Sequence, residues 1–348
     1  MPSYNTTSTS KPSLPPIHVG WIPYWNLHPF RCELENLSLT EGFHIRSGIP
    51  SEVNHWLHSD QVELAPCSSI QLLNQPDVEM AMPLGVAADG PVHSVYLGFQ
   101  AEHKPLIEIL KRRREYLAER ATRHIRRCSP DLRSAAKHIC TEIQNYDRVS
   151  LACIPKLSWH SESASSNGLA RLLFNLWFGE SLCKLMIDSG RANVLSTCPP
   201  VEVVIGDDAL KRRGDFYKIW DMGSLWKELT GLPFVYAVWQ SKHGQNNPWK
   251  TKILELGQKA ERRMRVDSSH YMPDLIPRDS QMRELPLAKY WASIYYCLGP
   301  TEMRSLVLFL SLCKALRIGE SSDHIVPKLI KWQNMSHKPS LAEIQGGF

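Results

Sequence analysis

The stretch PYWNLHP (residues 23–29) follows a short apolar run, and its one obvious proton carrier is His28. The unperturbed pKa of histidine suits proton transfer at neutral pH. A general base and an ordinary loop role are therefore the alternatives for His28, and the loop role is the favoured one.

The serine-rich turn at 161–168 (SESASSNG) is a second candidate site. It leads into a helical pattern with Leu169, Leu172, Leu173 and Leu176 on one side. Unpaired N–H groups at a helix start favour a carboxylate or a phosphate, and nearby hydroxyl groups add hydrogen bonds. N-capping of the helix by serine is the alternative.

Asp207 and Asp208 form a pair of neighbouring carboxylates after the apolar run at 201–205. Paired carboxylates are found in acid–base catalysis, but aspartate is also common in turns, where it bonds to its own backbone. A turn or a lobe-closing role is the favoured interpretation.

The common catalytic and cofactor motifs are absent. The sequence contains no H-E-x-x-H, G-x-x-x-x-G-K-[ST], G-x-G-x-x-G or G-x-S-x-G motif. Its nine cysteines form no C-x-x-C pair, which argues against a zinc ribbon or a disulfide framework and favours reduced, mostly buried thiols. The net charge of +5 suits an anionic small molecule as well as weak nucleic-acid contact.

Membrane insertion is not expected. The apolar run at 305–313 is about half of the roughly 20 residues needed to span a bilayer. Residues 1–16 are rich in serine, threonine and proline and lack the apolar core of a secretory signal. We expect a disordered leader at 1–16 and a cytoplasmic protein.

Short apolar runs alternate with helical patterns, as is typical of an α/β protein with mostly parallel strands. The strands are predicted at 18–22, 61–67, 92–99, 148–154, 201–207 and 234–239. A helix is predicted from Pro50, and the C-terminal third reads as helical at 251–266, 287–298 and 300–318. This last part shows no recognisable chemistry.

A basic helical hairpin is predicted between two of these strands. Residues 104–127 hold nine basic side chains and three glutamates around an apolar face, and a second helix follows Pro130. The hairpin is either a surface for an acidic partner or an amphipathic pair packed on the main body. Nucleic acid is the less favoured partner, because no aromatic residues are interleaved with the charges.

In this order, the motifs resemble the chorismate dehydratase family of the futalosine route to menaquinone. The segment DMGSLWKELTGLPFVYAVW at 221–239 is similar to the family signature almost residue for residue. The shorter matches are YWNLHPF (24–30), VELAPCSSI (62–70), GPVHS (90–94), SASS (163–166) and VIGDDAL (204–210).

The resemblance implies an α/β fold of the type 2 periplasmic-binding-protein kind. Two lobes would be joined by two crossing strands, with a ligand cleft between them. Lobe I would comprise 17–97 and 239–348, and lobe II would comprise 98–238. The stretch at 101–147 has no counterpart in the family pattern and is predicted as an insertion that could bind a protein partner.

The resemblance also implies a hydro-lyase that converts chorismate to 3-[(1-carboxyvinyl)oxy]benzoate without a metal or an organic cofactor. Asn26 and Ser94 correspond to the catalytic positions. No protein base stands out, so a substrate-assisted elimination is expected. The predicted substrate-binding residues are Ser68, Ser69, Gly90, Ser163, Ser165, Ser166, Gly206 and Asp207.

One difference from the family pattern and two alternative functions have to be considered. Ala164 stands where the family often has arginine, which removes an expected charge unless Arg46, Lys156 or the basic insertion replaces it. The related 1,4-dihydroxy-6-naphthoate synthase is disfavoured because its Ser-Pro-Cys-Pro-Asn-Asp motif is absent. A non-catalytic cytoplasmic sensor for a small carboxylate, or a pathway lyase with an altered substrate, is the other alternative.

Overall fold

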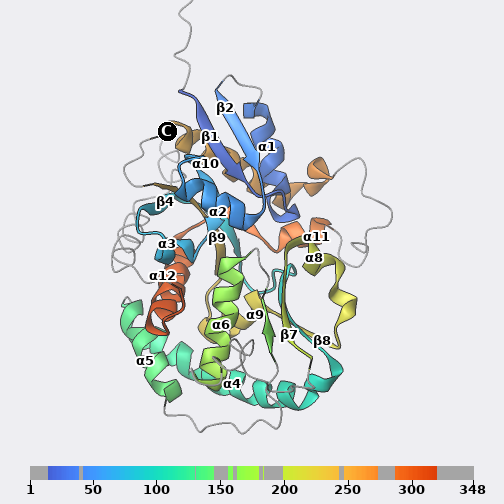
Figure 1. Cartoon of the computed structure of the whole chain (residues 1–348), viewed down its shortest axis with the longest axis vertical. Coiled ribbons are helices and arrows are strands. Elements are labelled where there is room, and N and C mark those ends of the chain that lie inside the picture. The colour runs from blue at the N-terminus through green and yellow to red at the C-terminus, as the bar shows by residue number, and fades with distance from the viewer. Residues whose placement is uncertain are drawn as a thin grey trace, which may run out of the picture.

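The computed structural model shown in Figure 1 covers most of the chain. It describes residues 15–38, 42–129, 131–144, 156–159, 163–179, 183, 199–242, 247–272 and 287–319. Within these segments, no helix combines the length and the apolar character needed to cross a membrane. The strand predicted at 148–154 and most of the leader predicted at 1–16 lie outside the described residues.

The first lobe, at the top of Figure 1, is built on two neighbouring sheets. Its strands are β1 (Ile17–Trp21), β2 (Phe43–Ser47), β3 (Ala65–Ser68), β4 (Val78–Ala88), β9 (Phe234–Lys242) and β10 (Tyr295–Cys297). The order of the larger sheet is β10–β4–β9–β3, and β1 pairs with β2 beside it. The associated helices are η1 (Trp25–Leu27), α1 (His28–Ser38), α2 (Pro50–His58), α3 (Gln71–Asn74), α10 (Trp249–Val266), η4 (Ser268–Tyr271) and α11 (Leu287–Ala292).

The second lobe contains one four-stranded sheet with the order β6–β7–β5–β8. These strands are β5 (Val95–Phe99), β6 (Leu157–Ser158), β7 (Val201–Ile205) and β8 (Lys218–Asp221). The helices around it are η2 (Ala101–His103), α4 (Lys104–Arg127), α5 (Leu132–Gln144), α6 (Ala164–Phe178), α8 (Gly206–Lys211), η3 (Arg213–Asp215) and α9 (Met222–Thr230). The last helix, α12 (Pro300–Ala315), packs against α5, α6 and β9.

The chain crosses between the lobes twice, and the predicted two-lobed α/β architecture is confirmed. It passes from β4 directly into β5 of the second sheet, and it returns through α9 into β9. Strands β4 and β9 pair with each other between the two crossings. The exact division of the chain into lobes remains a prediction, and the position of α12 beside α5 shows that the C-terminal part touches both lobes.

The expectation of mostly parallel strands is wrong for the described pairs. Only β1 with β2 and β6 with β7 pair in parallel, apart from an isolated bridge, whereas β9 is antiparallel to both β3 and β4. The chain leaves the first lobe after β4 and comes back along β9, so these two strands run in opposite directions. The helix predicted at 287–298 is also too long, because β10 replaces its second half.

Local signals explain where the helices near the cleft begin. In α2, Pro50 occupies the first turn and the Glu52 carboxylate accepts the Ile49 N–H at 3.0 Å. Ser163 caps α6, and Asp221 caps α9 by accepting the N–H of Ser224. These caps determine where the three helices begin.

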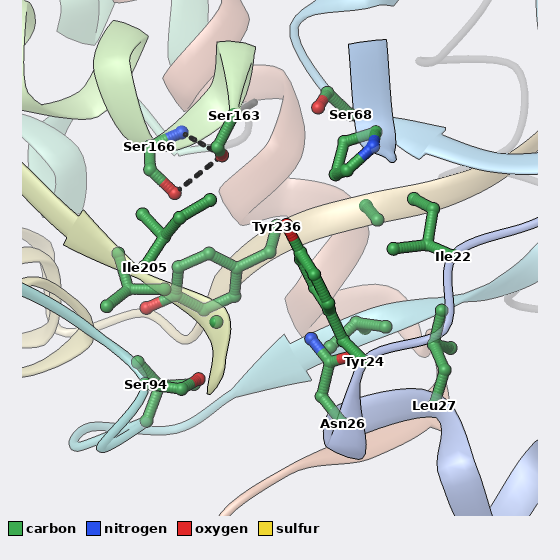
Figure 2. A pocket seen from close by; sticks show the side chains of 16 residues that line it. Ile22, Tyr24, Asn26, Leu27, Ser68, Ser94, Ser163, Ser166, Ile205 and Tyr236 are labelled. Carbon is green, nitrogen blue, oxygen red and sulfur yellow. Dashed lines mark hydrogen bonds between the residues drawn. The ribbon is translucent and has the colours of Figure 1, made fainter. Parts of the chain in front are cut away.

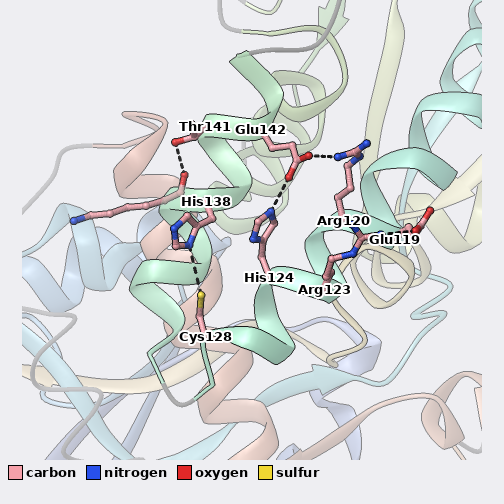
Figure 3. Close-up of polar contacts among 9 residues, drawn as sticks. Glu119, Arg120, Arg123, His124, Cys128, His138, Thr141 and Glu142 are labelled. Atoms are coloured by element: carbon pink, nitrogen blue, oxygen red, sulfur yellow. Dashed lines mark hydrogen bonds and ion pairs between the residues drawn. The ribbon is translucent and has the colours of Figure 1, made fainter.

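The α4–α5 hairpin is the amphipathic pair that the sequence predicts. Its apolar side chains are buried, and α4 packs against α9 while α5 packs against α12. Charged side chains of the two helices pair with each other at partly buried positions, and Glu142 binds both Arg120 and His124 (Figure 3). The His124 ring stacks on His138, with 5.4 Å between ring centroids.

Candidate functional site

A cavity lies between the two lobes (Figure 2). All the lining side chains in the described part of the chain are uncharged, and the polar ones belong to asparagine, serine and tyrosine. An apolar wall with a few polar groups is the usual form of a small-molecule site. The cavity is lined by Ile22, Tyr24, Asn26, Leu27, Pro50, Ser68, Val86, Val92, Ser94, Val95, Ser163, Ser166, Ile205, Gly206, Tyr236 and Ala237.

Asn26 reaches the cavity from η1, the short helix that follows β1. The Tyr296 hydroxyl donates a hydrogen bond of 2.8 Å to the backbone carbonyl of Asn26 and holds this turn in place. The side-chain oxygen Oδ1 of Asn26 is buried and has no hydrogen-bond partner among the described residues. A buried acceptor without a partner costs free energy, so this atom is suited to a donor supplied by a ligand.

Ser94 lines the cavity at the end of the loop between β4 and β5. The Asp221 carboxylate fixes this loop by accepting the backbone N–H groups of Val92 at 3.0 Å and His93 at 2.7 Å. His93 has a φ of +65°, which is unfavourable for a residue with a Cβ, so these bonds stabilise a strained turn. The N–H of Gly206 donates to the Ser94 carbonyl at 2.8 Å.

The serines at the start of α6 point in two directions. Ser163 and Ser166 line the cavity, and the Ser163 hydroxyl donates to Ser166 Oγ at 2.9 Å (Figure 2). Ser165 contacts protein instead, since its Oγ lies 3.1 Å from Ser69 Oγ and accepts the N–H of Ile70 at 3.2 Å. Ser69 and Ser165 therefore hold α6 against the segment after β3, and neither is a lining residue.

Of the other predicted binding residues, some line the cavity and some do not. Ser68 at the end of β3 and Gly206 at the start of α8 line the cavity, whereas Gly90 and Asp207 do not. Gly90 has a φ of +105° in the loop after β4. Asp207 Oδ1 accepts the backbone N–H of Trp25 at 3.3 Å, and this bond connects the second lobe to the first. Burial raises the pKa of the Asp207 carboxyl group.

His28 lies outside the cavity lining and begins α1. Its Nε2 is 3.1 Å from the carbonyl oxygen of Tyr271, and its ring stacks on Trp291 with 6.0 Å between centroids. Burial lowers the pKa of His28, which favours the neutral ring. His28 therefore packs against its neighbours and does not line the cavity.

Two tyrosines in the lining were missed by the sequence reasoning. Tyr236 on β9 is only 9% exposed, and its hydroxyl has no hydrogen-bond partner among the described residues. Burial raises the pKa of Tyr236 well above the usual value, so the hydroxyl remains a donor. The ring of Tyr24 packs on Gly206, where a Cβ would lie 3.1 Å from it. A polar hydroxyl within the apolar run at 234–239 was the available signal for Tyr236.

Ala164 stands where the family often has arginine, but residue 164 does not line the cavity. Ala164 lines a separate groove together with His55 and His58. A longer side chain at this position would therefore begin in that groove. Arg46, one suggested replacement for the missing charge, lies over the Trp56 ring at 3.9 Å and is also outside the lining.

Comparison with protein families gives a match over most of the chain. The family model described as "Menaquinone biosynthesis" matches residues 17–115 and 141–315, a span that contains every lining residue. The stretch between the matched segments is 116–140, which lies within the insertion predicted at 101–147, and the bounds of that insertion remain a prediction. The beginning of α4 is matched, and this helix packs against α9 as part of the second lobe.

Three of the solved structures that resemble the chain have titles that name a binding protein or the binding-protein fold. The product of the Candida albicans CA3427 gene, described as having the generic periplasmic binding protein fold, has a TM-score of 0.46 and 10% identity, covering 91% of this chain and 95% of its own. The alkanesulfonate-binding protein SsuA from Xanthomonas axonopodis pv. citri has a TM-score of 0.47 and 9% identity, with 92% and 98% covered. The aliphatic sulphonate binding protein SsuA from Escherichia coli has a TM-score of 0.47 and 9% identity, with 92% and 99% covered.

Proposed function

The chain belongs to the menaquinone biosynthesis family, and from this premise we propose that it is a chorismate dehydratase. The proposed reaction removes water from chorismate and yields 3-[(1-carboxyvinyl)oxy]benzoate, the first step of the futalosine route. Asn26 and Ser94, the residues at the catalytic positions of the family motifs, both line the cavity. This placement supports a role for both residues in the same reaction.

The observation that carries the proposal is that two lining residues each have a buried polar atom without a protein partner among the described residues. The two atoms are Oδ1 of Asn26 and the hydroxyl oxygen of Tyr236. Within the described residues each would be costly unless a ligand supplied its hydrogen bond. A substrate with a hydroxyl donor and carboxylate acceptors fulfils both requirements.

The proposed elimination needs orientation more than strong acids or bases. The C3–H bond of chorismate is activated by conjugation to the ring carboxylate, and its electron pair becomes part of the aromatic ring as the C4–O bond breaks. The enolpyruvyl carboxylate takes the C3 proton, which ends on the departing hydroxide as water. Asn26 accepts a hydrogen bond from the C4 hydroxyl, and Ser94 donates one to the same oxygen as it leaves.

The two substrate carboxylates would be held by neutral donors. Ser68, Ser163 and Ser166 line the cavity, and the first turn of α6 presents backbone N–H groups near them. The Tyr236 hydroxyl adds a fourth donor. Such groups stabilise an anion by direct hydrogen bonds without an ion pair.

The test is to incubate the purified protein with chorismate and to follow loss of the diene absorbance together with formation of the enolpyruvyl benzoate. Ser94→Ala is the active-site variant, and Ser311→Ala is the matched control. Ser311 is a buried serine in α12 that does not line the cavity. We expect turnover by the wild type and by Ser311→Ala, with a strong loss in Ser94→Ala.

A non-catalytic sensor for a small carboxylate is the second candidate. It is favoured by the uncharged lining, since no titratable base lines the described part of the cavity apart from the two tyrosines. Binding of chorismate without turnover, measured by calorimetry on the same protein sample, would support the sensor and exclude the dehydratase.

A further inference from the structure

The C-terminal segment supplies three aromatic side chains that support the cavity wall from behind. We call Tyr290, Trp291 and Tyr296 the aromatic brace. The Tyr290 hydroxyl donates to Ser94 Oγ at 2.9 Å, the Trp291 Nε1–H to the Trp25 carbonyl at 2.7 Å, and the Tyr296 hydroxyl to the Asn26 carbonyl at 2.8 Å. Both residues at the predicted catalytic positions are thus held by this segment.

The contact of Tyr290 differs from the other two because it reaches a side chain. Tyr290 and Ser94 are each 1% exposed, so no solvent competes for the bond between them. A phenol is more acidic than an alkyl hydroxyl and is the better donor. Since Ser94 Oγ accepts from Tyr290, the proton of Ser94 must point in another direction, and Ser94 faces the cavity.

We propose that Tyr290 is a positioning residue that orients the Ser94 hydroxyl so that it donates its hydrogen bond into the cavity. This inference rests on the proposed function, because the group that receives this bond is the departing C4 oxygen of the substrate. A serine that donates to this oxygen stabilises the negative charge that develops on it as the C4–O bond breaks. Tyr290 does not touch the substrate and acts through Ser94.

A purely structural role for this hydroxyl is less consistent with the surroundings. The backbone at Ser94 is already fixed by the Gly206 N–H and, through the preceding loop, by Asp221. Tyr290 is itself anchored by its ring in the core, and its carbonyl accepts the N–H of Ser293 at 3.0 Å. Loss of the hydroxyl alone should therefore leave the main chain in place and free only the Ser94 side chain.

The first test is Tyr290→Phe in the chorismate assay. We expect kcat to fall by about tenfold with little change in KM, because the lost bond acts on the leaving group and not on substrate binding. Tyr295→Phe is the matched control, since it removes another hydrogen-bonded tyrosine hydroxyl, the partly buried one that donates to Glu302 at 3.0 Å. Tyr295 lies outside the cavity lining, and kcat should stay unchanged in this variant.

A double-mutant cycle tests whether Tyr290 acts through Ser94. In the Ser94→Ala background, adding Tyr290→Phe should cause no further loss of kcat. Independent, multiplicative losses would overturn the proposal, and so would an unchanged kcat in Tyr290→Phe alone.

Crystal structures of the two tyrosine variants give a readout that does not depend on chorismate turnover. We expect Ser94 to occupy more than one rotamer in Tyr290→Phe and a single rotamer in Tyr295→Phe and the wild type. A single unchanged rotamer in all three would refute the positioning role. Absent turnover in the wild type together with a released Ser94 in Tyr290→Phe would reject only the dehydratase function.

Discussion

The polar groups of the cavity and those of the α4–α5 hairpin differ in charge, in exposure and in hydrogen bonding. In the cavity, neutral side chains such as those of Asn26 and Tyr236 have buried polar atoms without a protein partner among the described residues. In the hairpin, charged side chains lie near solvent and pair with each other, as Glu142 does with Arg120 and His124 (Figure 3). The family match covers the whole cavity lining but stops within the hairpin.

This difference follows from the free energy of burial. A buried charge without a partner is far more costly than a buried amide or hydroxyl, so a closed site can keep unpaired groups only if they are neutral. Partly exposed ion pairs cost little and contribute little. We therefore expect changes in the cavity to affect turnover and changes in the hairpin to affect stability.

The largest expected effect is on turnover in Asn26→Ala and Ser94→Ala. Each should lower kcat/KM by roughly 100-fold or more, as is typical when one donor or acceptor to a reacting oxygen is removed. The midpoint of thermal unfolding should change little, since the loop and η1 are held through backbone contacts. Wild-type rates in both variants would show that the reaction takes place elsewhere.

Tyr236→Phe should separate activity from stability. It should lower kcat/KM by roughly tenfold through loss of a substrate hydrogen bond. The unfolding temperature should stay constant or rise, because the change removes a buried hydroxyl that has no protein partner among the described residues. Tyr295→Phe should show the reverse pattern, with lower stability and unchanged turnover, because its hydroxyl is bonded to Glu302.

Asp207→Asn tests a buried carboxylate at the junction of the lobes. Burial raises the pKa of Asp207, so the folded state favours the protonated form and ionisation destabilises it. The asparagine oxygen can still accept the Trp25 N–H. The variant should therefore equal the wild type in stability at low pH and exceed it as the pH rises above the ordinary aspartate value of 3.8, which thermal melts across pH would measure. A lower stability of the variant at neutral pH would contradict this.

Glu142→Gln in the hairpin should show the opposite pH dependence and the smallest effect. The hydrogen bond from His124, followed by that from Arg120, lowers the pKa of Glu142. The carboxylate then stabilises the fold above the ordinary glutamate value of 4.5, and this contribution is lost as the pH falls. We expect a loss of up to about 1 kcal/mol at neutral pH in denaturant unfolding, with unchanged turnover. A fall in turnover would mean that the hairpin is coupled to the cavity.

The sequence predicted the local elements well where the pattern was regular. The helix expected at 104–127 has those bounds, and Pro50 begins α2 as expected. The sequence did not indicate β4, the longest described strand, and it gave the wrong direction for most strand pairs. Strand direction depends on how the chain returns from the other lobe, which is not encoded in the alternation of a single segment.

The candidate site was predictable only in part. Asn26, Ser68, Ser94, Ser163, Ser166 and Gly206 were expected and line the cavity, whereas Ser69, Ser165, Gly90 and Asp207 were expected and do not. Adjacent serines look equivalent in sequence. Ser165 differs from Ser166 because its hydroxyl meets Ser69, which lies 96 residues away along the chain.

The sequence by itself determined the uncharged chemistry of the site, through the asparagine and serine motifs, and the helices that carry them. Helix periodicity and capping act within a few residues and are therefore written locally. Only the tertiary structure decided which serines line the cavity and that the Tyr236 hydroxyl has no hydrogen-bond partner among the described residues. It also decided that Tyr290 donates a hydrogen bond to Ser94, which is 196 residues away along the chain. Those choices depend on contacts between distant segments, which form only when both lobes are folded.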